Sequence, residues 1–454
     1  MLIKAFFSED IAHLSYMLIG ANEIYIIDPQ RHIDIYLEEA KNRNLPITGV
    51  LLTHPHADFI SGHIELQKTT NARIYAHYQA PYHTDFHPVK ENDEILLDHI
   101  RIKVLETPGH TPFCNSFVIT DLSRGDEPVS VFTGDTLFVG DVGRPDLFPE
   151  KQEELAGLLY HSLFDKLFKL PDFVEVYPAH ASGSMCGKNL SEKRATTIGY
   201  EKRFNLRAKL TDKKAFVQNI LDDNLPVPEH FKYCAGINLK NPELLENLAP
   251  PVQISFEKFI QINKNENPII IDIRKHWNWV DFHLDNSLSI DVNCLSFANY
   301  AGWLIPRQRP IILIHENEND LKRAVNSLRK IGLDQQIYYL TNGIQDFIYE
   351  DFLLASTPSI RPEEVLQHPD KYRLIDVRNN PPEAKIFNKL NYTQTGINEI
   401  FENKFDFSKD DQDVIICEKG ALAAMIISFL EKNKISKPNY LLGSGRALQK
   451  FLNN

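Results

Sequence analysis

The stretch VLLTHPHADFISGH, residues 50–63, constrains the fold more than any other part of the chain. An apolar run ends abruptly in two histidines one residue apart, His54 and His56, and Asp58 follows. Because side chains alternate between the two faces of an extended segment, His54 and His56 are expected to point the same way. Metal sites need ligands that rigid strands hold at a loop mouth. The stretch therefore predicts a β-rich domain with a metal site at its strand ends.

Three further residues of the ligand type stand where other strands are expected to end. They are His110 in ETPGHTP, Asp135 in FTGDTLF and His180 in VYPAH. A lone histidine is usually a satisfied surface residue, but these three residues together with His54 and His56 make five in such contexts, which favours one shared site. Histidine and carboxylate side chains collected at loop mouths beside Gly and Pro are what a metal site with an open coordination position needs.

The hydrophobic pattern predicts a layered α/β protein. Short β-rich runs alternate with turns at 15–20, 23–29, 47–54, 72–77, 100–110, 116–120, 129–135 and 174–180. Amphipathic helical stretches lie at 33–44, 61–70 and 150–170, and a charged helical connector runs from about 190 to 248. The polar residues of interest all sit at the ends of the expected strands.

A weak internal repeat sets the domain count. NPIIIDIRKHWNW at 267–279 resembles KYRLIDVRNN at 371–380, and each precedes a second buried strand that runs into a helix. At 454 residues the chain exceeds what one hydrophobic core usually serves. We therefore expect a first domain at 1–250 and two α/β modules at 252–352 and 356–454.

Four of these segments carry a resemblance to a known family. THPHADFISGH, TPGH, FTGDTLFVGDVGRPDL and YPAH stand in the order and approximate spacing of the metallo-β-lactamase fold. More narrowly, the chain looks like persulfide dioxygenases that are fused to rhodanese domains. The resemblance implies an α/β chain: an αββα sandwich followed by two rhodanese-like domains with parallel sheets.

The same resemblance implies roles for the strand-end residues. His54, His110 and Asp135 would ligate one ferrous ion per chain, with zinc as a substitute. His56, Asp58 and His180 would orient these ligands or contact bound water.

Phe59 bears on the number of metals. Dinuclear zinc hydrolases of this fold carry a histidine directly after the aspartate, where it helps to hold the second metal. With Phe59 at that position, a second site loses a ligand and gains an apolar wall. Phe59 therefore favours one metal, although it does not by itself identify iron.

Two cysteines are candidates for sulfur chemistry. Cys186 in GSMCGK resembles a segment of relatives with rhodanese tails, which implies a place near the iron; a buried structural thiol is the alternative. Cys417 opens the loop CEKGAL between a strand and a helix, where amides and a helix N-terminus can stabilise a thiolate and then a persulfide. Leu422, however, stands where the rhodanese family normally has arginine. A persulfide carrier and an inactive relic both remain open for Cys417.

The corresponding loop of the middle module begins at His315 and holds no thiol. Its three carboxylates, Glu316, Glu318 and Asp320, would repel an anionic sulfur donor. This pattern predicts an inactive module.

The function that these features imply is oxidation of a low-molecular-weight thiol persulfide, such as that of glutathione, by dioxygen to sulfite and thiol. Cys417 would exchange sulfane sulfur with the thiol pool, linking sulfite to thiosulfate in sulfide metabolism. One alternative is a zinc thioester hydrolase of the glyoxalase II type. Another is a non-catalytic sulfur carrier or sensor.

Composition narrows the partners and the compartment. The net charge of −12 argues against nucleic acid. The N-terminus lacks the apolar region of a signal peptide, and no run is apolar enough to span a membrane. Five widely spaced cysteines indicate reduced thiols in a cytoplasm. The oligomeric state stays open, with a homo-oligomer as one alternative.

Overall fold

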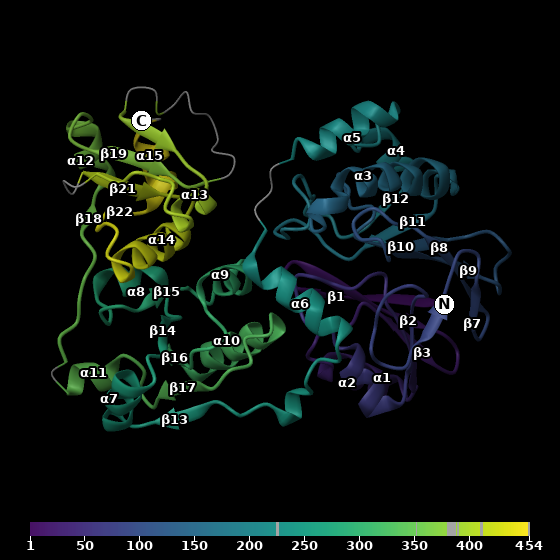
Figure 1. Cartoon of the computed structure of the whole chain (residues 1–454), viewed down its shortest axis with the longest axis horizontal. Coiled ribbons are helices and arrows are strands. Elements are labelled where there is room, and N and C mark those ends of the chain that lie inside the picture. The colour runs from purple at the N-terminus through teal and green to yellow at the C-terminus, as the bar shows by residue number, and fades with distance from the viewer. Residues whose placement is uncertain (224–226, 351, 379–386, 388–389, 409–411, 453–454) are drawn as a thin grey trace. The chain divides into compact units, whose positions relative to one another are not determined.

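The computed structural model describes residues 1–454 except 224–226, 351, 379–386, 388–389, 409–411 and 453–454. The chain divides into two compact units (Figure 1). The first comprises residues 1–248 with 328–332, and the second comprises 249–327 with 333–454. The last two residues of the repeat segment at 371–380 lie outside the described residues.

The first unit contains two six-stranded sheets. One has strands in the order β1 (Leu2–Ser8), β2 (His13–Ile19), β3 (Ile24–Ile27), β4 (Ile47–Leu51), β5 (Arg73–His77) and β6 (His87–Val89). The other, in the order β12 to β7, is built from β7 (Glu94–Leu97), β8 (Ile100–Glu106), β9 (Asn115–Asp121), β10 (Ser130–Gly134), β11 (Glu175–Pro178) and β12 (Thr196–Thr197). Both sheets mix parallel and antiparallel neighbours.

Apolar side chains between the two sheets form the central core, which includes Tyr16, Leu51, Phe117 and Phe132. The outer face of the first sheet is covered by α1 (Asp34–Arg43) and α2 (His63–Thr70). The outer face of the second sheet packs against α3 (Gln152–His161), α4 (Ile198–Phe204) and α5 (Lys213–Leu221). A further helix, α6, spans Glu229–Leu239. The expected αββα sandwich is therefore confirmed.

Several sequence-based boundaries need correction. Strand β4 ends at Leu51, so His54 and His56 lie in an irregular loop and not in the strand expected at 47–54. Helix α2 begins at His63, two residues later than expected. The helical region expected at 150–170 is a continuous series of η1 (Pro149–Lys151), α3, η2 (Ser162–Lys166) and η3 (Leu167–Lys169). The connector contains α4, α5, α6 and η4 (Leu245–Asn247).

The second unit repeats one parallel topology. The sheet of the middle module has the order β13 (Val252–Ile254), β17 (Ile337–Leu340), β16 (Ile311–Ile314), β14 (Ile269–Asp272) and β15 (Leu288–Ser289). The sheet of the last module has the order β18 (Ser359–Ile360), β22 (Asn439–Leu441), β21 (Asp413–Ile416), β19 (Arg373–Asp376) and β20 (Tyr392–Gln394). Both orders run first, fifth, fourth, second, third, and every pairing is parallel.

Helices connect these strands. The middle module contains α7 (Phe256–Asn265), α8 (His276–Asp281), α9 (Phe297–Leu304), α10 (Glu318–Lys330) and α11 (Gln345–Tyr349). The last module contains α12 (Pro362–Gln367), α13 (Ile397–Phe401), α14 (Ala421–Lys432) and α15 (Ser444–Leu452). The inferred repeat is therefore real, whereas the domain limits 1–250, 252–352 and 356–454 stay a prediction.

The two modules pack together within the second unit. Helix α14 lies against α8 and β15 (Figure 1). The Ser289 amide donates a 2.9 Å hydrogen bond to Ser428 Oγ, and Trp279 shares one buried cluster with Ile415 and Cys417. Residues of the middle module thus form part of the surroundings of Cys417.

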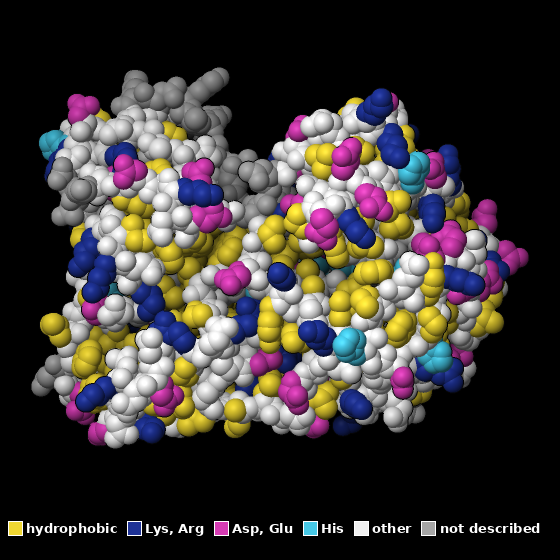
Figure 2. Space-filling model, viewed as in Figure 1, with side chains coloured by type: hydrophobic (Ala, Val, Ile, Leu, Met, Phe, Trp, Pro, Cys, Tyr) yellow, Lys and Arg dark blue, Asp and Glu magenta, His cyan; other side chains and the backbone are white. Residues whose placement is uncertain are grey.

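The surface carries charges of both signs. Figure 2 shows acidic and basic side chains interspersed over the face in view. Among the helices that the structure describes, none is both long and apolar enough to cross a membrane.

Candidate metal centre and sulfur site

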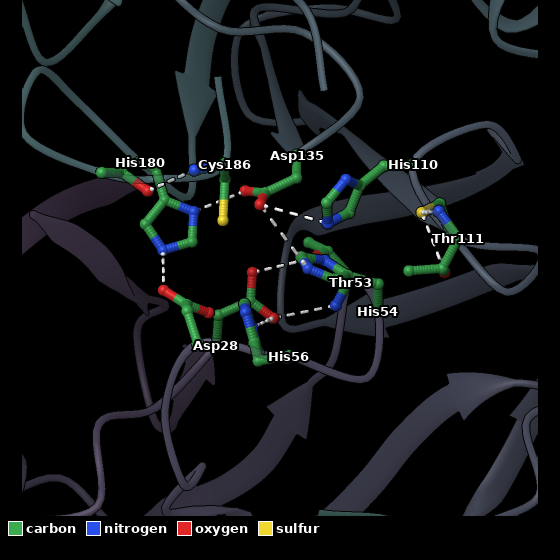
Figure 3. Close-up of polar contacts among 12 residues, drawn as sticks. Asp28, Thr53, His54, His56, His110, Thr111, Asp135, His180 and Cys186 are labelled. Carbon is green, nitrogen blue, oxygen red and sulfur yellow. Dashed lines mark hydrogen bonds and ion pairs between the residues drawn. The ribbon is translucent and has the colours of Figure 1, made fainter. Parts of the chain in front are cut away.

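The predicted ligand residues converge at one end of the sandwich. His54 and His56 follow β4, His110 follows β8, and Asp135 directly follows β10. His54, His110 and Asp135 are buried, and each offers a donor atom within 4.8 Å of the others (Figure 3). Their sequence positions are far apart, so this cluster exists only because the sheets bring their strand ends together.

Hydrogen bonds on the far side of each ring fix which nitrogen faces the cluster. Thr53 Oγ1 donates its proton to Asp28 Oδ2 at 2.7 Å, so it accepts from His54 Nδ1 at 2.9 Å. The Arg144 carbonyl can only accept, so His110 Nδ1 donates to it at 2.8 Å. Both histidines therefore present the lone pair of Nε2 to the cluster, which is the form that binds a metal.

The donor atoms at the centre of the cluster are His54 Nε2, His110 Nε2 and Asp135 Oδ2, and they face one another. Asp135 Oδ2 lies 3.8 Å from His54 Nε2 and 3.5 Å from His110 Nε2. Among the described residues, His54 Nε2 and Asp135 Oδ2 have no hydrogen-bond partner although both are buried. Buried polar atoms are nearly always satisfied, so converging lone pairs of this kind fit a divalent cation.

Electrostatics keep the donors in their ligating forms. Burial lowers the pKa of His54 and of His110 below the usual histidine value. Burial alone would raise the pKa of Asp135, but His180 and the two other histidines hold it well below the usual range. Neutral imidazoles and an ionised carboxylate are the states that a metal requires.

The residues expected to support the ligands lie around them. His180 bridges two carboxylates, with Nδ1 2.7 Å from Asp135 Oδ1 and Nε2 2.7 Å from Asp58 Oδ2. Burial opposes a charge on this ring, but the two carboxylates raise the pKa of His180 well above its usual value. His56 Nε2 lies 3.2 Å from Asp28 Oδ1.

Phe59 forms an apolar wall beside this cluster. It is fully buried, with its ring centroid 4.6 Å from that of His56 and 4.2 Å from that of His13. Sequence reasoning missed His13, which is buried at the start of β2 and forms an isolated bridge with His180. It also missed Asp28, although Asp28 follows a strand just as the other site residues do.

Cys186 lies at the same site. Its sulfur and donor atoms of Asp58 and His180 lie within 4.8 Å of one another, and Figure 3 shows the sulfur directed toward Asp135 and His180. Burial, then Asp58 and Asp135, raises the pKa of the Cys186 thiol well above its usual value. A bound cation would oppose this effect because it adds positive charge next to the thiol.

Cys417 occupies the expected position between β21 and α14. Its Sγ accepts a 3.1 Å hydrogen bond from the Gly420 amide, and its own amide donates to Ser444 Oγ at 2.9 Å. Gly420 has a φ of 107°, which suits glycine, and its amide reaches the sulfur in this conformation. Leu422 packs in the apolar cluster that includes Cys417, so no cation takes the place of the missing arginine at that position.

The equivalent loop of the middle module is shorter than expected. Helix α10 begins at Glu318, which places Glu318 and Asp320 in its first turn. His315 is buried and its Nε2 donates to the Leu340 carbonyl at 3.0 Å. This loop therefore anchors its own sheet.

Comparisons with known proteins agree with the fold of both units. The model of the metallo-beta-lactamase superfamily matches residues 9–180, and the model of the rhodanese-like domain matches residues 255–350. A crystal structure of a metallo-beta-lactamase from Staphylococcus aureus subsp. aureus COL is 30% identical, has a TM-score of 0.67, and covers 75% of this chain and 99% of that one. The chain belongs to the metallo-β-lactamase superfamily.

Curated relatives within this superfamily have two different activities. The mitochondrial persulfide dioxygenase ETHE1 of Mus musculus is 29% identical over 224 residues, which are 48% of this chain and 80% of that protein. A hydroxyacylglutathione hydrolase of Francisella tularensis subsp. novicida is 31% identical over 184 residues, which are 40% of this chain and 68% of that protein. The expected combination of a metallo-β-lactamase domain with a C-terminal rhodanese-like region is confirmed.

Proposed function

We propose that this chain is a persulfide dioxygenase that uses one ferrous ion, held by His54, His110 and Asp135. Its substrate is a low-molecular-weight thiol persulfide, such as glutathione persulfide. Likeness to the persulfide dioxygenase ETHE1 and the attached rhodanese-like modules support this proposal.

The observation that carries the proposal is a three-donor set beside the buried ring of Phe59. Two imidazoles and one carboxylate leave several positions open on an octahedral metal, enough for a sulfur anion and dioxygen. A hydrolase of this fold with two zinc ions uses a further histidine where this chain places an apolar ring, and the second donor set here contains Cys186 beside Asp58 and His180. The hydrolase function is therefore the second candidate, favoured only by the likeness to hydroxyacylglutathione hydrolases.

The overall reaction balances without any further oxidant. One persulfide, one dioxygen and one water give one thiol, one sulfite and two protons, and the outer sulfur supplies all four electrons that dioxygen accepts. The iron, when bound, would supply the open positions and the redox capacity. Asp58 anchors one side of the His180 ring, and the other side of the ring holds Asp135 in place. Phe59 excludes water from one side of the site.

The two cysteines would handle sulfur outside the oxidation step. We propose that Cys417 carries sulfane sulfur, and that a Cys417 persulfide reacting with sulfite gives thiosulfate and the free thiolate. Cys186, next to Asp135, would hold or relay sulfur at the metal site. The middle module would take no sulfur, because its loop has no thiol.

A side-by-side assay tests this proposal. The iron-loaded protein is given glutathione persulfide in an oxygen electrode and, separately, a glutathione thioester without oxygen. We expect oxygen uptake with matching sulfite release, and no thioester cleavage above background. Thioester cleavage without oxygen, together with no persulfide-dependent uptake, would establish the hydrolase instead.

A further inference from the structure

The thiol of Cys417 is almost fully enclosed, at 3% exposed, and residues of both modules enclose it. Trp279 and Val280 on α8 of the middle module belong to the same buried cluster as Cys417 and Tyr440. Helix α8 packs directly on α14, which is the helix that follows the Cys417 loop. A module whose own sulfur-binding loop has no thiol therefore builds part of the wall around the thiol of its neighbour.

His276 is the polar residue of that wall. It is buried at the start of α8, and a Cβ atom added to Gly420 would lie 2.8 Å from its Nε2. The amide of the same glycine donates to Cys417 Sγ at 3.1 Å. The same Cβ position would lie closer still to the Tyr440 hydroxyl, so the imidazole of His276 and the hydroxyl of Tyr440 both lie beside the loop residue whose amide binds the sulfur.

Asp291 sets the orientation of this imidazole. Its Oδ2 accepts from His276 Nδ1 at 3.0 Å and from the His276 amide at 3.1 Å, while its Oδ1 accepts from the Asn293 amide at 2.9 Å. A carboxylate on Nδ1 fixes the proton there and leaves the lone pair of Nε2 toward Gly420. Burial would raise the pKa of Asp291, but the hydrogen bonds from His276 and Asn293 hold it below the usual range.

Among the residues that the structure describes, the other titratable groups around the thiol offer no comparable base. Burial raises the pKa of Tyr440 and of Tyr300, and Cys417 adds to both rises. Burial, Asp291 and Cys417 together raise the pKa of Cys294, which Lys419 partly offsets. Glu418 is engaged with Arg446 at 2.7 Å and with Arg378 at 3.5 Å.

We propose that the His276–Asp291 pair of the middle module completes the sulfur site of Cys417, with His276 Nε2 as the base that takes the thiol proton through one intervening water. The freed thiolate attacks the outer sulfur of a persulfide, so that a bond forms between Cys417 Sγ and that sulfur. The bond between the two substrate sulfurs breaks, and its electron pair leaves on the thiolate product. The proton on Nε2 then passes to this product, so Cys417 thiol and persulfide become Cys417 persulfide and free thiol.

This inference rests on the proposed sulfur transfer at Cys417. It gives the middle module a role in that transfer, although the module's own loop has no thiol that could carry sulfur. It also offers an alternative to the missing arginine. In this site a neighbouring imidazole activates the thiol, where most rhodanese loops rely on an additional loop cation. The proposed pair is unrelated to the iron ligands, so the two sites can be tested separately.

The test measures the rate at which Cys417 gains sulfur from glutathione persulfide, followed by site-resolved mass spectrometry of the full-length protein. A general base contributes on the order of 100-fold, so we expect His276→Gln to slow the reaction by about that factor near neutral pH. The variant should also lose the rise of the rate with pH that a neutral imidazole produces, and added imidazole should restore part of the rate. Asp291→Asn should slow the reaction in the same direction.

His315→Ala is the matched control, because it removes a buried histidine of the same module that bonds only to its own sheet. Rates equal to wild type in both His276→Gln and Asp291→Asn would overturn the inference, while Cys417 transfer itself would stand. Wild-type protein that never gains sulfur on Cys417 would overturn both. A slowed His276→Gln variant that imidazole and pH leave unaffected would show that the ring is only structural, which also overturns the inference.

Discussion

Replacing Phe59 by histidine tests the reason for a single metal. Asn238 on α6 holds the loop backbone, since its Nδ2 donates to the carbonyls of His56 and Phe59 at 2.8 Å each. The substitution therefore changes the side chain and leaves the loop in place. In metal-free protein the buried imidazole nitrogens have no assured partner, which costs about 1–3 kcal/mol of unfolding free energy.

Zinc should reverse this loss. The new ring would lie against His13 and His56, and Asp58 precedes it in the chain, so these side chains offer ligands that could share a second ion with it. An ion at a hundredfold excess over its dissociation constant stabilises the folded state by about 2.7 kcal/mol, enough to offset the loss. We expect urea unfolding to show Phe59→His below wild type with chelator and near wild type with zinc, with one extra zinc per chain by elemental analysis.

Phe59→Leu is the matched control, because it keeps the site apolar and offers no ligand. It should lose stability equally with and without zinc. If Phe59→His binds no more zinc than Phe59→Leu, and zinc does not stabilise it further, then the phenylalanine is not what limits the site to one metal.

Four further predictions concern other residues. Asp135→Ala should lose both bound iron and oxygen consumption, because it removes the carboxylate between His54 and His110; elemental analysis and an oxygen electrode check this. Cys417→Ser should keep nearly full dioxygenase turnover of a supplied persulfide but lose sulfur exchange with thiosulfate, as labelled-sulfur transfer would show. His315→Ala should leave every sulfur-transfer rate unaltered, and a clear loss in folded protein would show that the middle loop takes part. Burial lowers the pKa of His63 to about 3, so below its usual value of 6.5 the unfolded chain gains a proton that the folded chain does not. As the pH is lowered from 6.5 to about 3, the unfolding free energy of the wild type should therefore decrease more steeply than that of His63→Leu. Urea titrations at several acidic pH values would measure this difference.

The resemblance to the metallo-β-lactamase fold predicted the αββα sandwich, and local patterns placed His54, His110 and Asp135 near strand ends, where the structure brings their donor atoms together. Each of these residues follows a strand within a few residues, and strand ends in a layered sheet meet at one edge. Asp28 obeys the same rule after β3, so a stricter application would have found it. The irregular path from Leu52 to Gly62 was not predictable, since tertiary contacts such as those of Asn238 set it.

Residues that depend on distant parts of the chain escaped prediction. His13 stands at the beginning of a strand, and only its bridge to His180 brings it beside Phe59. His276 precedes Cys417 by more than a module, and only the packing of α8 on α14 turns it toward Gly420. No local pattern in the sequence marks either histidine, because both are defined by the partners that folding supplies.

The metal content of protein purified without oxygen tests the central claim most directly. Elemental analysis combined with the persulfide-dependent oxygen uptake of the same sample gives both the identity and the role of the metal. We expect about one iron per chain, with turnover proportional to the iron bound. Two zinc ions per chain, in protein that takes up no oxygen with persulfide, would contradict this claim.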